Sequence, residues 1–251
     1  MDLPITPALD HLGIVVLVVL SFVSSILTAA LGAGGGLLML SVMATTMPAA
    51  AVIPVHGIVQ LGSNGGRALL AREHVVCRVT AVLLAGGIVG ALLGSLLLFR
   101  LPMDWLQLSI AVFVLYMVWS PTPRIGNTST TGMALFGAFS SFLGLFVGAT
   151  GPLVGAYIQR LGLNRHQFVA SAAACMTGLN LLKLAVFGAT GFEWRGWLLL
   201  ALLMIASGIG GTWVGLRLLG HLPERVFRQA LRWMLSLLAL HLAWRGLLAL
   251  T

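Results

Sequence analysis

Charged residues are scarce in this sequence, and acidic residues are scarcer still. Charged side chains make up 8% and hydrophobic ones 59% of the 251 residues, against roughly 25% and 45 to 50% in an ordinary soluble domain. This composition excludes a soluble protein. Intramembrane carboxylates commonly serve proton relays and cation sites, and their absence from the apolar segments argues against a cation substrate. The six acidic residues all lie in a terminus, in a loop or at a segment edge: Asp2, Asp10, Glu73, Asp104, Glu193 and Glu224.

The sequence also lacks the residue patterns of metal sites, disulfide frameworks and common enzymes. Its two cysteines, Cys77 and Cys175, fall in different apolar segments and have no metal-ligand spacing around them. It has no H-E-x-x-H motif, no paired intramembrane carboxylates and no Ser or Cys beside a base at a recognisable spacing. We therefore predict no metal, no cofactor and no catalytic residue.

Basic residues outnumber acidic ones and give a formal net charge of +8. The 14 Lys and Arg residues are spread over short loops, without the stripe or the interleaved aromatics that are typical of nucleic-acid surfaces. Orientation in a membrane explains the excess more economically. We therefore expect no nucleic-acid partner.

Apolar segments fill almost the whole sequence. Each is about 17 to 25 residues long, the length that spans a bilayer as a helix. They lie at 13–31, 50–70, 79–99, 105–120, 133–148, 166–189, 196–219 and 226–248. The sequence thus predicts an all-α polytopic membrane protein that crosses the lipid bilayer about eight times.

The two halves of the sequence resemble each other. "FVSSILTAALGAGGGLL" aligns with "FSSFLGLFVGATGPLV" at an offset of 116, and this register also places Asn64 on Asn180 and Arg67 on Lys183. After an insertion of five residues, "AGGIVGALLGSLLLFRLP" aligns with "ASGIGGTWVGLRLLGHLP" at an offset of 121. Shared apolar composition would not align glycines, prolines and a cation in order. We predict a first transmembrane repeat at 10–120, a linker at 121–131 and a second repeat at 132–250.

Each repeat contains a glycine-rich interruption, "LGAGGGLLML" at 31–40 and "GATGP" at 148–152. A nucleotide-binding loop would need a preceding strand and a Lys or acidic partner at a set spacing, and neither occurs. We interpret both stretches as helix breaks, because non-helical backbone at membrane depth is tolerated where it lines a cavity. A half-helix that begins after Gly35 or Gly151 would point backbone N–H donors toward an anion. The alternative is that these glycines only allow close helix packing.

Loop charges favour inverted repeats. The sequence has three arginine clusters, namely Arg72 with Arg78, Arg160 with Arg165, and Arg217 with Arg225 and Arg228. They fall on one side of the membrane only if 37–47 and 153–162 fold back as re-entrant half-helices. Parallel repeats remain the alternative. Internal repeats with interrupted segments are typical of secondary transporters, whose substrate site lies at the repeat interface.

Polar side chains form one stripe in each repeat. His56, Gln60, Ser63, Asn64 and Arg67 project within roughly 100° of a helix surface at about 100° per residue, and Thr177, Asn180 and Lys183 form a shorter stripe. A cation buried without an acidic partner suits a bound anion, although snorkelling to the interface and hydrogen bonding between helices are alternatives. The predicted substrate-binding residues are Gly34, Gly35, Gly36, His56, Gln60, Asn64, Arg67, Thr150, Gly151, Thr177, Asn180 and Lys183.

The pattern of breaks, polar segments and glycines resembles the sulfite exporter TauE/SafE family of permeases. The resemblance rests on "GAGGGLLML", "IPVHGIVQLGSNGGRALL", "GGIVGALLGSLLL" and the weaker copy "GATGPLVGAYIQRLGLNRHQFVASAAACMTGLN". It implies movement of small sulfur oxyanions or organosulfonates across the cytoplasmic membrane, often outward.

These observations predict a secondary transporter for small sulfur-containing anions that works by alternating access between the two repeats. Its expected partners are the small anionic substrate and the lipid bilayer. His56 could take up a proton near neutral pH and so couple anion movement to protons, although a lone histidine in such a segment is also a common packing residue. A membrane-embedded enzyme and a non-transporting membrane subunit are the alternative interpretations. The sequence does not predict an oligomeric state.

Overall fold

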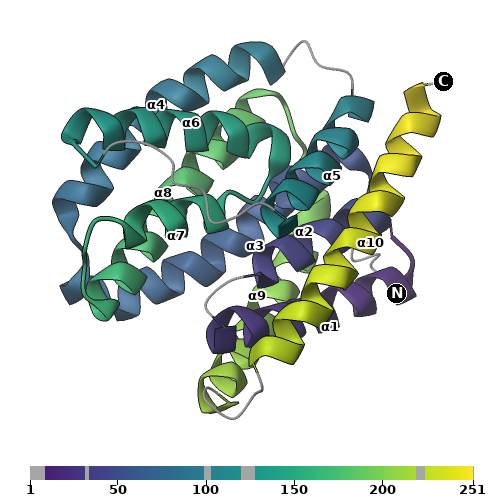
Figure 1. The fold of residues 1–251 in the computed structure, drawn as a ribbon. Coiled ribbons are helices and arrows are strands. Elements are labelled where there is room, and N and C mark those ends of the chain that lie inside the picture. The colour runs from purple at the N-terminus through teal and green to yellow at the C-terminus, as the bar shows by residue number, and fades with distance from the viewer. Residues whose placement is uncertain (1–8, 32–33, 99–102, 120–127, 219–223, 251) are drawn as a thin grey trace. The chain divides into compact units, whose positions relative to one another are not determined.

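The computed structural model describes residues 9–31, 34–98, 103–119, 128–218 and 224–250. Within these ranges it contains ten α-helices, one short 3-10 helix and no strand, which confirms the predicted all-α fold class. In chain order the helices are α1 (His11–Leu31), α2 (Gly35–Thr46), α3 (Ala49–Leu70), η1 (Arg72–His74), α4 (Cys77–Leu98), α5 (Met103–Trp119), α6 (Thr130–Val147), α7 (Gly151–Gln159), α8 (Arg165–Ala189), α9 (Arg195–Leu218) and α10 (Glu224–Leu250) (Figure 1).

Each predicted apolar segment corresponds to one long helix. Among the described residues, α1, α4, α6, α8 and α9 are long and apolar enough to cross a membrane. The chain is therefore an integral multi-pass membrane protein, while eight crossings stay a prediction. With 12 and 9 residues, α2 and α7 extend about 18 Å and about 14 Å, too short for a hydrocarbon core of roughly 30 Å.

Helical geometry is interrupted between α1 and α2 and again between α6 and α7, as the sequence predicts. Gly34 has a φ of 99° and Gly148 a φ of 78°, in the left-handed region that glycine enters without steric cost. Gly32 and Ala33, which belong to the first predicted break, lie outside the described residues. The short helices α2 and α7 thus begin after glycine-dependent breaks.

Two compact units make up the structure, and each takes helices from both halves of the sequence. The first unit comprises Met1–Val59, Pro102–Ser120 and Glu193–Thr251, and the second comprises Gln60–Leu101 and Pro121–Phe192. The first unit therefore holds α1, α2, the start of α3, α5, α9 and α10. The second holds the end of α3 together with α4, α6, α7 and α8. The compact units do not coincide with the sequence repeats, whose boundaries stay a prediction.

In the second unit, α4 and α6 lie side by side along much of their length (Figure 1). Their backbones touch because glycine stands at each close contact. A Cβ atom on any of three glycines would overlap a carbonyl oxygen of the other helix, in the pairs Gly86 with Ala134, Gly90 with Ala138 and Gly137 with Leu83. Small residues promote this kind of close helix association in membranes.

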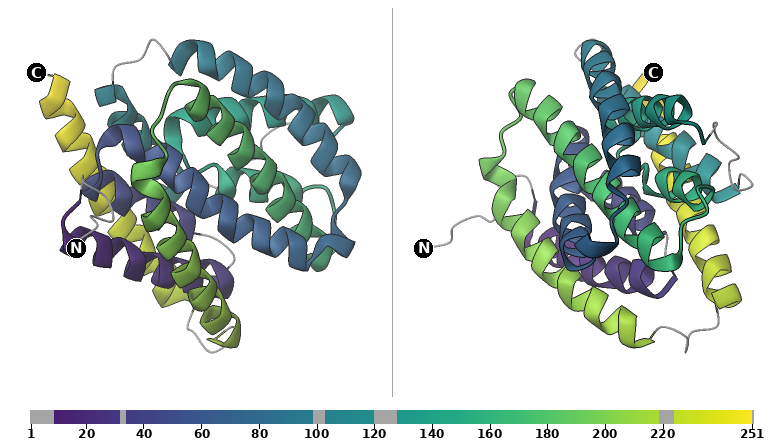
Figure 2. Two further views of the ribbon diagram at one scale, coloured as in Figure 1. Left: turned by 180° about the vertical axis from the view of Figure 1, so that it is seen from behind. Right: turned by 90° about the vertical axis from the view of Figure 1, so that its left-hand side faces the viewer.

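In the first unit, α1 and α9 form a comparable pair (Figure 2). Here two serine hydroxyls cross the contact: Ser21 Oγ donates to the carbonyl of Met204 at 2.6 Å, and Ser207 Oγ donates to that of Val18 at 2.7 Å. A third position repeats the glycine contact, since a Cβ on Gly211 would overlap the carbonyl oxygen of another α1 residue, Phe22.

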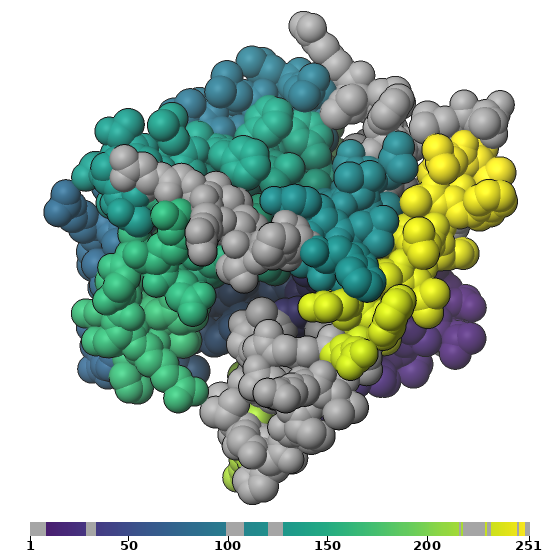
Figure 3. All heavy atoms as spheres, in the orientation of Figure 1, coloured from purple at the N-terminus to yellow at the C-terminus, as the bar shows by residue number. Residues whose placement is uncertain are grey.

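The helices α5 and α10 also pack together within the first unit, and their surfaces meet in Figure 3. Trp119 Nε1 donates to Ser236 Oγ at 2.8 Å, and the Trp119 ring meets the edge of the Trp233 ring with centroids 5.5 Å apart. These contacts attach the end of α5 to the middle of α10.

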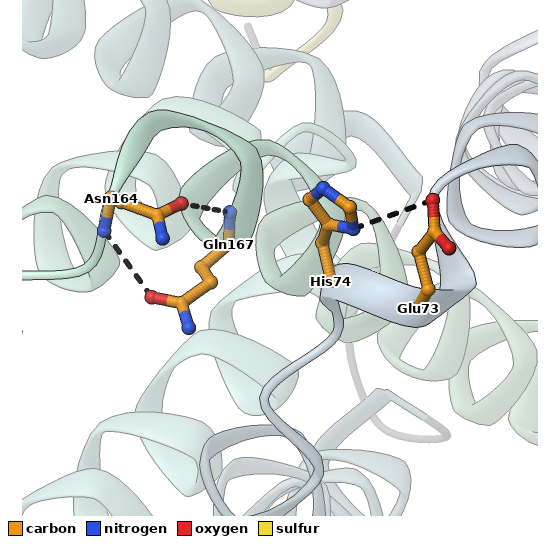
Figure 4. Close-up of polar contacts among 4 residues, drawn as sticks. All are labelled: Glu73, His74, Asn164 and Gln167. Carbon is orange, nitrogen blue, oxygen red and sulfur yellow. Dashed lines mark hydrogen bonds and ion pairs between the residues drawn. The ribbon is translucent and has the colours of Figure 1, made fainter.

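The start of α8 is fixed by polar contacts in the second unit (Figure 4). Asn164 Oδ1 accepts from the backbone N–H of Gln167 at 2.9 Å, and Gln167 Oε1 accepts from that of Asn164 at 3.3 Å. This reciprocal pair is a capping box. His74 of η1 packs edge-on against His166 with ring centroids 5.0 Å apart and lies 3.7 Å from the Glu73 carboxylate. The helix that carries Asn180 and Lys183 therefore begins at a defined position against η1.

Candidate functional site

The second break is held by a buried lysine. Lys183 on α8 is 5% exposed, and its Nζ donates to the carbonyl of Gly148 at 2.5 Å and to Asn180 Oδ1 at 3.1 Å. Gly148 ends α6, so the ammonium group supplies a donor to backbone that has left helical geometry. Lys183 and Asn180 thus lie at the break between α6 and α7.

Unused hydrogen-bond donors surround this lysine. An ammonium has three N–H donors, and the described residues provide acceptors for two of those on Lys183. Asn180 is 1% exposed, and its Nδ2 has no partner among the described residues. Thr150, the residue before α7, makes no capping hydrogen bond with its side chain. The first amides of α7 have no acceptor within the helix, and Pro152 in its first turn brings no N–H of its own.

Close packing brings three helices together at this point. A Cβ on Gly144 of α6 would lie 3.7 Å from Thr150 and 3.8 Å from Lys183 Cε, and a Cβ on Gly151 of α7 would lie 3.8 Å from Met176 on α8. The break, the start of α7 and the Lys183 side chain are therefore in mutual contact within one unit.

The polar stripe on α3 forms a chain of hydrogen bonds along its own helix. Arg67 Nη2 donates to Asn64 Oδ1 at 2.9 Å, and Arg67 Nε donates to the carbonyl of Ser63 at 3.3 Å. Asn64 Nδ2 donates to the carbonyl of Gln60 at 2.8 Å. The Asn64 and Arg67 pair has the same spacing and the same amide-to-cation bond as Asn180 and Lys183. Lys183 also bonds to the carbonyl of Gly148 outside its own helix, whereas these two bonds of Arg67 stay within α3.

Thr177 links the end of α3 to α8. Its Oγ1 donates to the carbonyl of Ala173 at 2.7 Å, one turn earlier on the same helix. Its methyl group lies 3.9 Å from where a Cβ on Gly65 would stand. The Thr177 hydroxyl is thus satisfied locally, and its methyl faces α3 in the second unit.

The first break is packed tightly within the first unit. A Cβ on Gly35 would overlap the carbonyl of Ser24 and the hydroxyl of Thr28 on α1. The buried His56 of α3 places its Nε2 3.1 Å from the carbonyl oxygen of Gly36, so the nitrogen acts as the donor. Each break is therefore contacted by a basic side chain from the next long helix of its repeat.

The structure divides the predicted binding residues into three groups. Gly34, Gly35, Gly36 and His56 lie at the first break; Thr150, Gly151, Asn180 and Lys183 lie at the second; Gln60, Asn64, Arg67 and Thr177 lie along α3 and the facing part of α8. Sequence reasoning missed Gly144, the carbonyl of Gly148 and the buried Ser140, whose hydroxyl has no partner among the described residues. The only sequence signal for Ser140 was the alignment of the two halves at an offset of 116, which pairs it with Ser24.

Comparison with known proteins agrees with a membrane permease. The sequence pattern of the sulfite exporter TauE/SafE family matches residues 17–242. A Haemophilus influenzae protein described as "Probable membrane transporter protein" is 26% identical over 219 residues, covering 79% of this chain and 84% of that protein. No solved structure matches the chain. Because the family pattern covers most of this multi-pass, all-helical chain, the protein belongs to the sulfite exporter TauE/SafE family.

Proposed function

We propose that this protein is a secondary transporter for small sulfur-containing anions, such as sulfite or organosulfonates, in a bacterial-type inner membrane. Membership of the TauE/SafE family supports this proposal, and so does similarity to a protein described as a membrane transporter. Both also agree with a function other than catalysis.

The observation that carries the proposal is the arrangement of Lys183 and Asn180 at the second break. The site offers an ammonium, an unused carboxamide N–H₂ and the first amides of α7. Glu73 is the only acidic residue in the sequence of the second unit, and 79% of its side chain is exposed. Hydrogen bonds from charged donors to oxyanions are about twice as strong as neutral ones. Such a set of donors suits an oxyanion and repels a metal cation.

Alternating access is part of the proposal, and the parts that move as bodies are helix pairs that join the two repeats rather than the intact repeats. A transporter of this kind needs parts that hold together while the site changes its exposure. The α4–α6 and α1–α9 pairs supply such parts, since each is locked by contacts between backbones or by hydroxyl groups at the backbone. The two pairs occupy corresponding positions at the offsets that align the two halves of the sequence.

Purified protein in proteoliposomes tests this function. Labelled sulfite or taurine should cross the membrane faster than in protein-free vesicles, and Lys183→Met should remove most of the difference. Arg217→Met is a matched control that also removes one cation, since Arg217 is exposed and stacks 3.5 Å above the Trp213 ring. Flux no greater than that of empty vesicles would refute the transport function. Full flux in Lys183→Met would place the site elsewhere.

We also propose that proton movement accompanies anion movement and that His56 carries the proton. Its contact with the Gly36 carbonyl connects the imidazole to the first break, and histidine changes its charge near neutral pH. A pH-sensitive dye inside the vesicles should report proton flux that depends on the anion. A dye signal that is the same with and without the anion would disprove the coupling.

A further inference from the structure

Among the described residues, Lys183 brings the positive charge that contacts the break between α6 and α7. Lys183 Nζ bonds to Gly148 and Asn180 there. The other cation on a predicted polar stripe, Arg67, bonds to Ser63 and Asn64 of its own helix. The other arginines that the structure describes in the second unit are exposed, namely Arg72, Arg78, Arg160 and Arg165; Arg100 and Arg124 lie outside the described residues.

We propose, on the basis of the transport function above, that the α6–α7 break accepts oxyanions that carry one negative charge and rejects those that carry two. Sulfite would then be carried as hydrogensulfite, and organosulfonates would be preferred to sulfate.

The balance between charges and neutral donors supports this selectivity. One ammonium neutralises one negative charge, while Asn180 Nδ2, the Thr150 hydroxyl and the amides of α7 supply hydrogen bonds without charge. A second negative charge would be buried without a counter-charge, which is strongly unfavourable. Asn180 adds a second, independent indication, since its N–H₂ group is buried and has no partner among the described residues.

Two probes of similar shape test the charge rule in the full-length protein. Methanesulfonate carries one charge at all relevant pH values, whereas methylphosphonate changes from one charge to two between mildly acidic and mildly alkaline pH. We expect similar dissociation constants at acidic pH by calorimetry in detergent. At alkaline pH methylphosphonate should bind at least about tenfold more weakly than methanesulfonate, a factor that corresponds to about 1.4 kcal/mol. The ratio of the two dissociation constants at each pH cancels any titration of the protein that affects both probes equally.

Three outcomes would overturn the inference. One is methylphosphonate binding equal to or tighter than that of methanesulfonate at alkaline pH. Another is the absence of binding for both probes at every pH. The third is normal methanesulfonate binding in Asn180→Asp, since a carboxylate there would neutralise Lys183 and remove the N–H₂ donors. Asn164→Asp is the matched control, because Asn164 is exposed and aspartate also caps helices.

The same experiments separate this inference from the proposed function. Charge-selective binding without flux in vesicles would retain the site and refute transport. Flux of sulfite without discrimination between the two probes would retain transport and refute the charge rule.

Discussion

The α4–α6 pair and the α1–α9 pair solve the same packing problem in two ways. At the offsets of 116 and 121 that align the two halves, Gly86 corresponds to Ser207 and its neighbour Ala134 corresponds to Val18. A Cβ on Gly86 would overlap the carbonyl of Ala134, whereas Ser207 Oγ donates a hydrogen bond to the carbonyl of Val18. The same carbonyl position is thus covered by backbone in one unit and by a hydroxyl in the other.

A second pair of contacts shows the same exchange. Gly137 faces the carbonyl of Leu83, and the corresponding Ser21 donates to that of Met204. Lipid offers helices little hydrophobic driving force for association, so close packing and hydrogen bonds between helices take its place. Glycine at these two sites places backbone against backbone, and serine at the corresponding sites bonds to the corresponding carbonyl through its hydroxyl.

The two breaks differ as well. Lys183 holds the carbonyl of Gly148, which follows the last helical residue of α6. His56 contacts the carbonyl of Gly36, which lies inside the first turn of α2. The second break is therefore contacted by the amine of a lysine, and the first by the imidazole of a histidine.

The largest expected effect comes from placing a branched side chain in the contact between α4 and α6. Gly90→Val would drive a branched side chain into the Ala138 carbonyl, and backbone cannot move aside as a flexible side chain would. We expect a loss of about 3 kcal/mol or more in the free energy of unfolding, or failure to fold. Thermal unfolding in detergent measures it. Gly211→Val should cost as much, since Gly211 faces Phe22 in the same way; a mild effect in either variant would contradict the view that both pairs are locked.

The difference between the breaks predicts the next largest effect. Lys183→Met should lower anion flux about 10- to 100-fold, because a bond to a charged group contributes about 1.5 to 3 kcal/mol. His56→Gln keeps an N–H donor and should lose mainly the proton flux that accompanies the anion. Flux and dye signals in the same vesicles separate the two variants. Equal loss of both signals in both variants would mean that the breaks do not differ in role.

Smaller effects on stability are expected when alanine is placed at the same corresponding position of the two helix pairs. Gly86→Ala should cost about 1 to 3 kcal/mol, since even one methyl group overlaps the Ala134 carbonyl. Ser207→Ala, at the corresponding position, removes one hydrogen bond and should cost about 0.6 kcal/mol, the average for such bonds in a membrane protein. Chemical unfolding of the two variants under the same conditions provides the measurement, and a reversed order would show that the hydroxyl contributes more than the close approach.

The smallest expected effect is a gain in the free energy of unfolding. A Cβ on Gly66 of α3 would meet nothing within 4 Å, so Gly66→Ala should raise the free energy of unfolding by about 0.5 to 1 kcal/mol through helix propensity alone. The unfolding midpoint tests this. A loss of stability at Gly66 would show that the helix carries a strain unrelated to contacts between helices.

Much of the fold can be predicted from the sequence. The long helices and both breaks follow from apolar length and from glycine at 34 and 148, because these signals are local in the chain. The glycines at 87, 90 and 94 suggest close packing, yet Gly86, one residue earlier, also faces the backbone of α6. Helical periodicity does not say which helix is the partner. The sequence therefore does not predict that α4 packs against α6, and α9 against α1, each a helix from the other half of the chain.

The candidate site was predicted in part. The repeat pointed to Asn180 and Lys183, and the structure places both at the second break. The sequence suggested the same role for Arg67, which bonds along its own helix instead. The carbonyl of Gly148 was missed because backbone acceptors leave no trace in residue type.

Each compact unit contains helices from both halves of the sequence, and this sharing has a consequence for how the chain could have arisen. Each half supplies one member of the α4–α6 pair and one of the α1–α9 pair, so a fragment cut at the middle linker would expose two unmatched helix faces. A half-length ancestor would have gained these contacts by domain swapping, as a dimer in which each copy lent one helix to the other. In one continuous chain, the linker between the halves would keep these swapped helices together without a second copy.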